Sequence, residues 1–278
     1  MPETTYINGY HPSVLATHNA RTAQNSCQFL LPTLSTLSTT HASFSLLDAG
    51  CGPASITISL ALLFPAARIT ALDLSSKALE PGRHAAKQQN VSNIEFKEGN
   101  VYTLPFADEI FDVVHAQQLL CHLPDPIKAI AELLRVTKKG GVLALREADT
   151  RAIFFYPELP LLKKNWELFA KTMEGEGNTG DTSAGRKLRK WVRSAGVKEE
   201  EVRCSAGTWC YSSEVERVAF GEAWMERVVE SEFAVKVVEQ GLATKQEMAE
   251  IREGWREWSQ DPDGWLCIPH GEALITNI

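Results

Sequence analysis

Between Phe44 and about residue 150, short apolar runs alternate with stretches of helical periodicity, and this alternation restricts the possible folds most. Positions 142–145 read Val-Leu-Ala-Leu, which is typical of a parallel strand buried on both faces. Strands alternating with helices predict βαβ units and a doubly wound parallel α/β sheet. We expect strands at about 44–49, 68–73, 93–97, 111–116 and 141–147, and helices at about 54–64, 81–90 and 125–137.

The segments on either side of this region lack the alternation of short apolar runs and helical stretches. Residues 12–31 predict one helix ended by Pro32, followed by a connector at 33–43 that is rich in Leu, Ser and Thr. All seven tryptophans lie beyond Asp149. In that half we expect helices at about 158–173, 183–195, 213–240 and 244–259, and strands near 201–211 and 265–276.

Composition narrows the class of partner and the compartment. Of the 278 residues, 44% are hydrophobic and 23% are charged, as in an ordinary globular protein. The formal net charge of −7 gives no overall field that would attract nucleic acid or an anionic membrane, so we expect neither as a partner. The six cysteines form no CxxC pair, and the sequence shows no secretory signal or run of 18 apolar residues, which favours a cytoplasmic protein.

A glycine loop follows the first expected strand. Gly50 and Gly52 allow a tight turn and a close backbone approach to a ligand, and the next helix offers unpaired N–H groups at its N-terminus. Asp48 lies beside this loop, where its carboxylate would repel the phosphates of a dinucleotide but attract an ammonium group. An NAD-linked oxidoreductase therefore fits the strand pattern but not Asp48.

Two further polar positions follow at the spacing of successive βαβ units. Asp73 ends the second expected strand, where a carboxylate can accept hydrogen bonds from two ribose hydroxyls. Asn100 and Val101 follow the third strand, where a side-chain amide and a backbone N–H can recognise the edge of an adenine ring. This ordered set predicts a site for a nucleotide-like ligand that carries a cationic group.

At this point the sequence resembles the class I methyltransferases that depend on S-adenosylmethionine (SAM). The similar segments are 46–55, 71–75, 98–114 and 132–145, and the last two look most like the ubiquinone and menaquinone methyltransferase group with its small-molecule relatives in fungi and actinobacteria. The resemblance implies a Rossmann-like seven-stranded sheet, an N-terminal helix, a helical insertion before the last strand, and SAM as cofactor.

The resemblance also implies a role for each motif residue. Gly50 and Gly52 would line the methionine part of SAM, Asp73 would hold the ribose, and Leu74 would pack on the adenine. Two departures from the pattern are Ala54, which replaces a third glycine, and Asn100, which replaces an aspartate. The expected cofactor-binding residues are Tyr10, Arg21, Asp48, Gly50, Cys51, Gly52, Asp73, Leu74, Asn100, Val101, Ala116 and Gln117. The N-terminal segment with Tyr10 and Arg21 is either a lid over SAM or a surface helix.

Three side chains near the carboxyl edge of the sheet are catalytic candidates. His122 has a residue type suited to accepting a proton, and Glu147 and Asp149 follow the fifth strand, where open α/β sheets place substrates. Each also has a structural alternative, as a buried histidine or as a helix cap. No metal-ligand spacing is present, so we expect no metal. The basic run at 186–193 is expected to be a solvated helix face.

The sequence therefore predicts a single methyltransferase domain over 1–278. It would comprise an N-terminal helical lid (1–43), a SAM-binding core (44–150) and a substrate-covering part (151–278) with a helical insertion at 213–260. We expect methyl transfer to a small-molecule acceptor, a secondary or specialised metabolite. The alternative is a SAM-binding protein or a non-methylating catalyst that uses SAM structurally. The acceptor atom and the oligomeric state are not readable from the sequence.

Overall fold

The computed structural model describes residue 9, residues 11–175 and residues 177–277. The chain divides into two compact units. The sheet unit contains Asn19–Glu147, Ala184–Gly207 and His270–Ile278, and the helical unit contains Met1–His18, Ala148–Ser183 and Thr208–Pro269. The second division along the chain, between Glu147 and Ala148, falls close to the boundary expected at residue 150, but two later segments return to the sheet unit. The single-domain organisation stays a prediction.

The sheet unit is built on five parallel strands in the order β3-β2-β1-β4-β5. Strand β8 lies next to β5 in the sheet, and β7 pairs with β8. The strand order reverses between β1 and β4, and open α/β sheets bind their ligands beside such a switch point, at the carboxyl ends of the strands. The bounds are β1 (Ser45–Ala49), β2 (Arg68–Asp73), β3 (Ile94–Glu98), β4 (Phe111–Gln117), β5 (Thr137–Ala148), β7 (Val202–Tyr211) and β8 (Trp265–Thr276).

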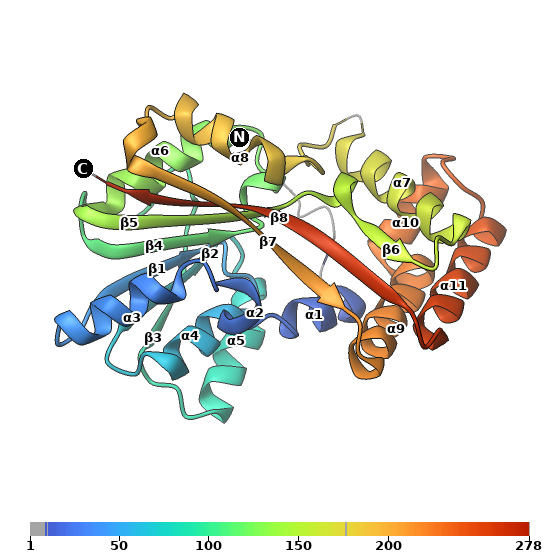
Figure 1. Ribbon diagram of the computed structural model, residues 1–278, viewed down its shortest axis with the longest axis horizontal. Helices are drawn as coiled ribbons and strands as arrows, with labels where there is room; N and C mark the ends of the chain where they lie inside the picture. Colours follow the sequence, from blue (N-terminus) through green and yellow to red (C-terminus); the bar gives the residue numbers. More distant parts are fainter. Residues whose placement is uncertain (1–8, 10, 176, 278) are drawn as a thin grey trace. The chain divides into compact units, whose positions relative to one another are not determined.

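Helices cover both faces of this sheet (Figure 1). On one face, Leu133 and Leu188 pack into a buried core with strand residues such as Val114. On the other, Leu34 and Leu60 pack against strand residues in a second core. The helices are α2 (Ala23–Ser26), α3 (Leu31–Thr40), α4 (Ser55–Leu63), α5 (Ser76–Gln88), α6 (Pro126–Val136) and α8 (Ala184–Ser194), with short 3₁₀ turns η1 (Leu120–His122) and η3 (Glu199–Glu201).

The helical unit holds an aromatic core. Trp224 stacks on Trp255 with ring centroids 5.3 Å apart, and Trp166 meets Trp224 edge to face at 4.8 Å. Because Trp224 and Trp255 are almost completely buried, packing accounts for them. The unit contains α1 (Pro12–Asn19), η2 (Thr150–Ala152), β6 (Phe154–Tyr156), α7 (Pro160–Glu174), α9 (Glu214–Glu230), α10 (Glu232–Glu239) and α11 (Lys245–Gln260). Strand β6 pairs antiparallel with the beginning of β8.

The doubly wound α/β fold is confirmed, but several elements differ from expectation. The single helix at 12–31 is wrong, because Thr22 and Asn25 form a capping box that starts α2, and Pro32 lies in the first turn of α3 rather than ending a helix. The helix expected at 213–240 is two helices, because the backbone of Ser231 is extended (φ −85°, ψ 169°). Pro81 lies inside α5, and β6 is an additional strand, so the described chain has eight strands rather than seven.

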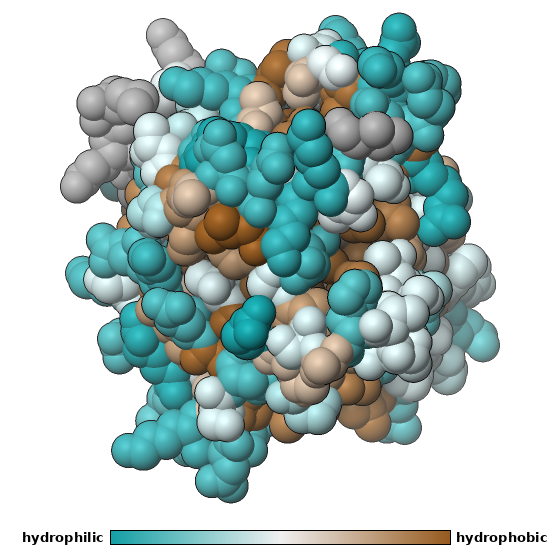
Figure 2. Space-filling model, turned by 90° about the vertical axis from the view of Figure 1, so that its left-hand side faces the viewer, coloured by the Kyte–Doolittle hydropathy of each residue, from teal (hydrophilic) through white to brown (hydrophobic). Residues whose placement is uncertain are grey.

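The surface mixes polar and apolar side chains. On the face shown in Figure 2, hydrophilic residues predominate and hydrophobic ones form separate patches between them. Such a mixture is ordinary, since apolar atoms contribute more than half of the surface of folded proteins. None of the helices in the described part of the chain has the length and apolarity that a bilayer crossing requires.

Candidate functional site

The glycine loop joins β1 to α4 and has a left-handed backbone at three positions. Gly50 and Gly52 have φ of +71° and +54°, which glycine adopts without strain, and Ala54 has φ of +58°, which costs an alanine about 1–2 kcal/mol. A Cβ on Gly50 would lie 2.8 Å from a Leu119 methyl carbon. The N–H groups of Gly50 and Cys51 both donate to the carbonyl oxygen of Leu72, at 2.7 and 3.0 Å. The loop is therefore clamped to the end of β2.

Asp73 braces the same loop through its side chain. One carboxylate oxygen accepts a hydrogen bond from the Gly52 N–H at 2.9 Å, and the other accepts from the Ser75 N–H at 3.2 Å. Burial raises the pKa of Asp73 above its usual value. The next side chain, Leu74, is 51% exposed although it is apolar. The end of β2 thus presents a partly buried carboxylate beside an uncovered leucine.

Both carboxylate oxygens of Asp48 contact other side chains of the protein. One of its oxygens lies 2.8 Å from His115 Nδ1, and the other accepts from the Thr57 hydroxyl at 2.5 Å. The second ring nitrogen of His115 lies 3.6 Å from the Cys27 sulfur. Burial opposes protonation of His115, but the Cys27 sulfur and the Asp48 carboxylate outweigh it and raise the pKa to about 10. Asp48 therefore has a buried cationic partner of its own.

The turn after β3 is held by Asn100. Its side-chain oxygen accepts a hydrogen bond from the Tyr102 N–H at 2.9 Å, and its carbonyl oxygen accepts from the Thr103 N–H at 3.0 Å. Val101 between them is buried. These bonds fix the backbone of the turn at the carboxyl edge of the sheet.

The end of β4 is linked to β5 by buried polar side chains. Ala116 is completely buried, and the Gln117 amide, in the orientation that pairs both of its polar groups, donates to the Ser26 carbonyl oxygen at 3.2 Å and accepts from Arg146 at 3.1 Å. Gln118 has a positive φ of 50° and donates its N–H to the Arg146 carbonyl oxygen at 2.9 Å. This left-handed residue could not be predicted from the sequence, because glutamine is not a residue type that signals such a turn.

Glu147 holds the turn that follows β4. Its carboxylate accepts hydrogen bonds from the backbone N–H groups of Leu119, Leu120 and Cys121, at 3.1, 2.9 and 3.3 Å. It is completely buried, and burial raises its pKa to about 7. Glu147 therefore has a structural contact, but it lies at the 3₁₀ turn η1 and not at the helix start near residue 151 that was its expected structural alternative.

The remaining candidate residues do not all belong to the same unit. Arg21 and His122 belong to the sheet unit, and they lie close enough to interact electrostatically. Burial, together with the nearby Arg21, lowers the pKa of His122 to about 4, so its imidazole is neutral at pH 7 but a weak base. Asp149 is buried in the helical unit, where its N–H donates to the Pro269 carbonyl oxygen at 2.9 Å. Tyr10 lies outside the described residues.

A doubly wound sheet with a left-handed glycine loop and an acidic residue at the end of β2 defines a class of nucleotide-cofactor proteins. Residues 40–196, more than half of the chain, match a family described as a methyltransferase domain, and the chain belongs to this family. It is 29% identical over 277 residues to an uncharacterized methyltransferase of Schizosaccharomyces pombe, with 97% of this chain and 95% of that one covered. The chain is therefore a SAM-dependent methyltransferase.

Further similarities support the same assignment. A demethylmenaquinone methyltransferase of Lactococcus lactis is 34% identical over 130 residues, covering 46% of this chain and 49% of that one. The solved structure of phosphoethanolamine N-methyltransferase 2 from Haemonchus contortus, with phosphomonomethylethanolamine and S-adenosylhomocysteine, matches with a TM-score of 0.54 at 14% identity. It covers 89% of this chain and 52% of that one, and it shows the fold. The expected resemblance to the menaquinone methyltransferase group is confirmed.

Proposed function

We propose that this methyltransferase acts on a small-molecule acceptor, a secondary or specialised metabolite. The observation that carries the proposal is the braced glycine loop, with Asp73 and the exposed Leu74, at the edge of the sheet where the strand order reverses. Its net charge of −7 supports a small acceptor rather than a nucleic acid. The Lactococcus relative is named for demethylmenaquinone, which is itself a small molecule.

The residues at this edge fit the parts of SAM. Gly50, Cys51 and Gly52 would approach the methionine part with their backbone, and the Asp73 carboxylate would accept hydrogen bonds from the ribose hydroxyls. Leu74, half exposed, offers an apolar face for the adenine ring. The sulfonium of SAM supplies an activated methyl group when it is bound.

The adenine edge would meet the turn after β3. The Asn100 side-chain oxygen accepts from Tyr102, but an amide oxygen has two lone pairs and can also accept from the adenine amino group. The Val101 N–H would face a ring nitrogen, and Ala116 and Gln117 would form the floor of the site. For Asp48 we infer a positioning role, because His115 and Thr57 already occupy its oxygens.

Methyl transfer places modest demands on the protein's own side chains. The acceptor must be held in line with the activated methyl group and water must be excluded, so alignment contributes most of the catalysis. If the acceptor carries a proton, His122 and Asp149 remain the candidate bases, since the Glu147 carboxylate is bound by three N–H groups. The cysteines are all free thiols, which supports a reducing compartment such as the cytoplasm.

Calorimetric binding of S-adenosylhomocysteine to Asp73→Asn tests the cofactor site. The variant keeps an oxygen for the Gly52 N–H but loses the charge, so we expect affinity to fall about 10- to 100-fold, the worth of a hydrogen bond to a charged group. Asp108→Asn is the control, because Asp108 is an exposed carboxylate paired with Arg135. Equal affinity in wild type and Asp73→Asn would show that the ribose assignment is wrong.

The acceptor class needs a separate measurement. The enzyme is incubated with SAM and fractionated small-molecule extracts, and S-adenosylhomocysteine formation is followed by mass spectrometry. We expect turnover with at least one small-molecule fraction and none with RNA or protein fractions. Turnover confined to a macromolecular fraction would contradict the small-acceptor proposal. Consumption of an acceptor without S-adenosylhomocysteine formation would favour the non-methylating alternative.

A further inference from the structure

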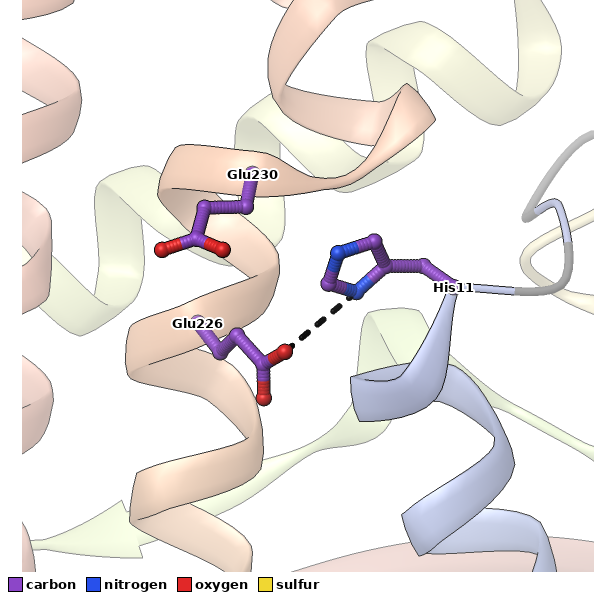
Figure 3. A group of neighbouring side chains, drawn as sticks. All are labelled: His11, Glu226 and Glu230. Carbon is purple, nitrogen blue, oxygen red and sulfur yellow. Dashed lines mark ion pairs between the residues drawn. The ribbon is translucent and has the colours of Figure 1, made fainter.

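Three potential metal ligands meet in the helical unit, on elements that the methyl-transfer proposal does not use. His11, Glu226 and Glu230 each offer one ligand atom, and these atoms all lie within 4.8 Å of one another. An ion pair joins His11 Nδ1 to a Glu226 oxygen at 3.9 Å. Figure 3 shows the imidazole directed at both carboxylates, with the two glutamates on one helix and the histidine on another segment.

The sequence places the two carboxylates on one side of α9. Glu226 and Glu230 are four residues apart, so they lie one above the other on the same helix face. Two carboxylates at this spacing repel each other unless a cation lies between them. Glu226 is half-buried and Glu230 is exposed, so both side chains can rotate toward a shared ligand.

His11 is held where its ring can complete the group. It precedes the first helical residue of α1, and its Nδ1 lies 2.9 Å from the Ser13 hydroxyl and 3.3 Å from the Ser13 N–H. The Ser13 N–H donates to Nδ1 in the tautomer that is protonated on Nε2. Metal binding through Nε2 requires the other tautomer, in which Nδ1–H donates to the Ser13 hydroxyl and Nε2 has a free lone pair. Histidine ligands are commonly oriented by a hydrogen bond from the other ring nitrogen.

Helix α1, which follows His11, is hydrogen-bonded to α9, which carries both glutamates. The Arg227 guanidinium on α9 donates to the Ser13 carbonyl oxygen at 2.8 Å and to the Thr17 hydroxyl at 2.9 Å, both on α1. Further negative charge faces the same segment, because the Glu232 carboxylate lies 2.2 Å from the position of a Cβ on Gly9. The N-terminal segment is thus bound to α9 beside three carboxylates.

We propose that His11, Glu226 and Glu230 bind a divalent transition-metal ion of the zinc type. One imidazole nitrogen and two carboxylate oxygens suit Zn²⁺, and three protein ligands leave a fourth position for water. Zinc–ligand bonds of about 2.0–2.2 Å bring ligand atoms closer together than 4.8 Å, so the glutamates close by side-chain rotation. The ion would join α1 to α9 and neutralise the repulsion between the two carboxylates.

Isothermal titration calorimetry with Zn²⁺ tests the site in the full chain. We expect saturable binding of one ion to the wild type, and affinity at least about tenfold lower in His11→Asn and in Glu230→Gln. Asparagine caps helices well, so His11→Asn removes the imidazole while it preserves the start of α1. Glu222→Gln is the matched control, because it removes one exposed carboxylate from the same helix but not from the group, and its affinity should equal that of the wild type.

Three results would overturn the proposal. The first is no saturable Zn²⁺ binding by the wild type. The second is unchanged affinity in His11→Asn and Glu230→Gln, which would assign the zinc to the exposed thiols of Cys204 or Cys210. The third is equal affinity for Mg²⁺ and Zn²⁺, because an imidazole ligand favours the transition metal. Circular dichroism of each variant verifies that it is folded before the titration.

Discussion

The Glu147 carboxylate is completely buried against three backbone N–H groups, and its pKa of about 7 lies above the ordinary value of 4.5. A group whose pKa is higher in the folded state binds more protons there than in the unfolded chain. Its contribution to stability is therefore complete below pH 4.5 and is lost as the pH rises to about 7. The shift corresponds to about 3 kcal/mol.

Replacing Glu147 by glutamine should remove this pH dependence. We expect the free energy of unfolding of the wild type, measured in urea from pH 4.5 to pH 8, to contain a decrease of about 3 kcal/mol that is missing in Glu147→Gln. The control is Glu80→Gln, which changes an exposed glutamate of α5. Parallel pH profiles for wild type and Glu147→Gln would show that Glu147 titrates normally.

Residue types alone predicted which positions lie at the edge of the sheet, but not what they touch. Asp48, Asp73 and Glu147 are each among the last two residues of a parallel strand, so the topology brings them to one edge. Their hydrogen bonds depend on partners distant in sequence, such as His115 for Asp48, 67 residues away. An argument from charge at the loop could not anticipate that a buried histidine would compensate Asp48.

At the level of elements, strands were easier to predict than helix boundaries. The run at 68–73 matches β2 because a buried parallel strand must be apolar, whereas α3 lies in a Ser- and Thr-rich connector where burial of Leu34 outweighs weak helix propensity. Likewise β6 has only three residues, too few for a periodic pattern, and it is stabilised by pairing with β8. Contacts with distant parts of the chain therefore determine whether elements such as α3 and β6 form.

Gly82 shows how one helix position controls the glycine loop. A Cβ at residue 82 of α5 would lie 2.9 Å from the Ala54 Cβ, 2.9 Å from the Pro53 carbonyl oxygen and 3.0 Å from a Phe96 ring carbon. We expect Gly82→Ala to destabilise the fold by about 1–3 kcal/mol, the usual cost of overpacking. It should also weaken S-adenosylhomocysteine binding, because the loop must shift. Urea unfolding and calorimetry measure the two effects.

A double-mutant cycle locates the clash. Ala54→Gly removes one of the crowding atoms and suits the φ of +58° at that position, so Gly82→Ala should cost less in the Ala54→Gly background than in the wild type. The Pro53 contact persists in both backgrounds, so the relief should be partial. Equal costs in the two backgrounds would place the strain elsewhere.

The two units of the molecule differ in their tryptophan content and in their proposed contacts with SAM. Six of the seven tryptophans belong to the helical unit, and Trp191 belongs to the sheet unit. The residues proposed to contact SAM through the glycine loop, β2 and β3 belong to the sheet unit. Tryptophan fluorescence therefore reports mainly on the helical unit, whereas far-ultraviolet circular dichroism reports on both.

The helical unit consists of three chain segments whose covalent connections run only through the sheet unit, so its unfolding should follow that of the sheet unit. When the sheet unit unfolds, it no longer holds the ends of the three segments close together, and bringing them together again across long loops costs entropy.

Saturating S-adenosylhomocysteine, at about 100 times its dissociation constant, stabilises the binding unit by about 2.7 kcal/mol. We expect the fluorescence and dichroism midpoints to rise together by a few degrees in thermal unfolding, and much less in Asp73→Asn. A fluorescence midpoint that stays constant while the dichroism midpoint rises would show that the helical unit folds independently.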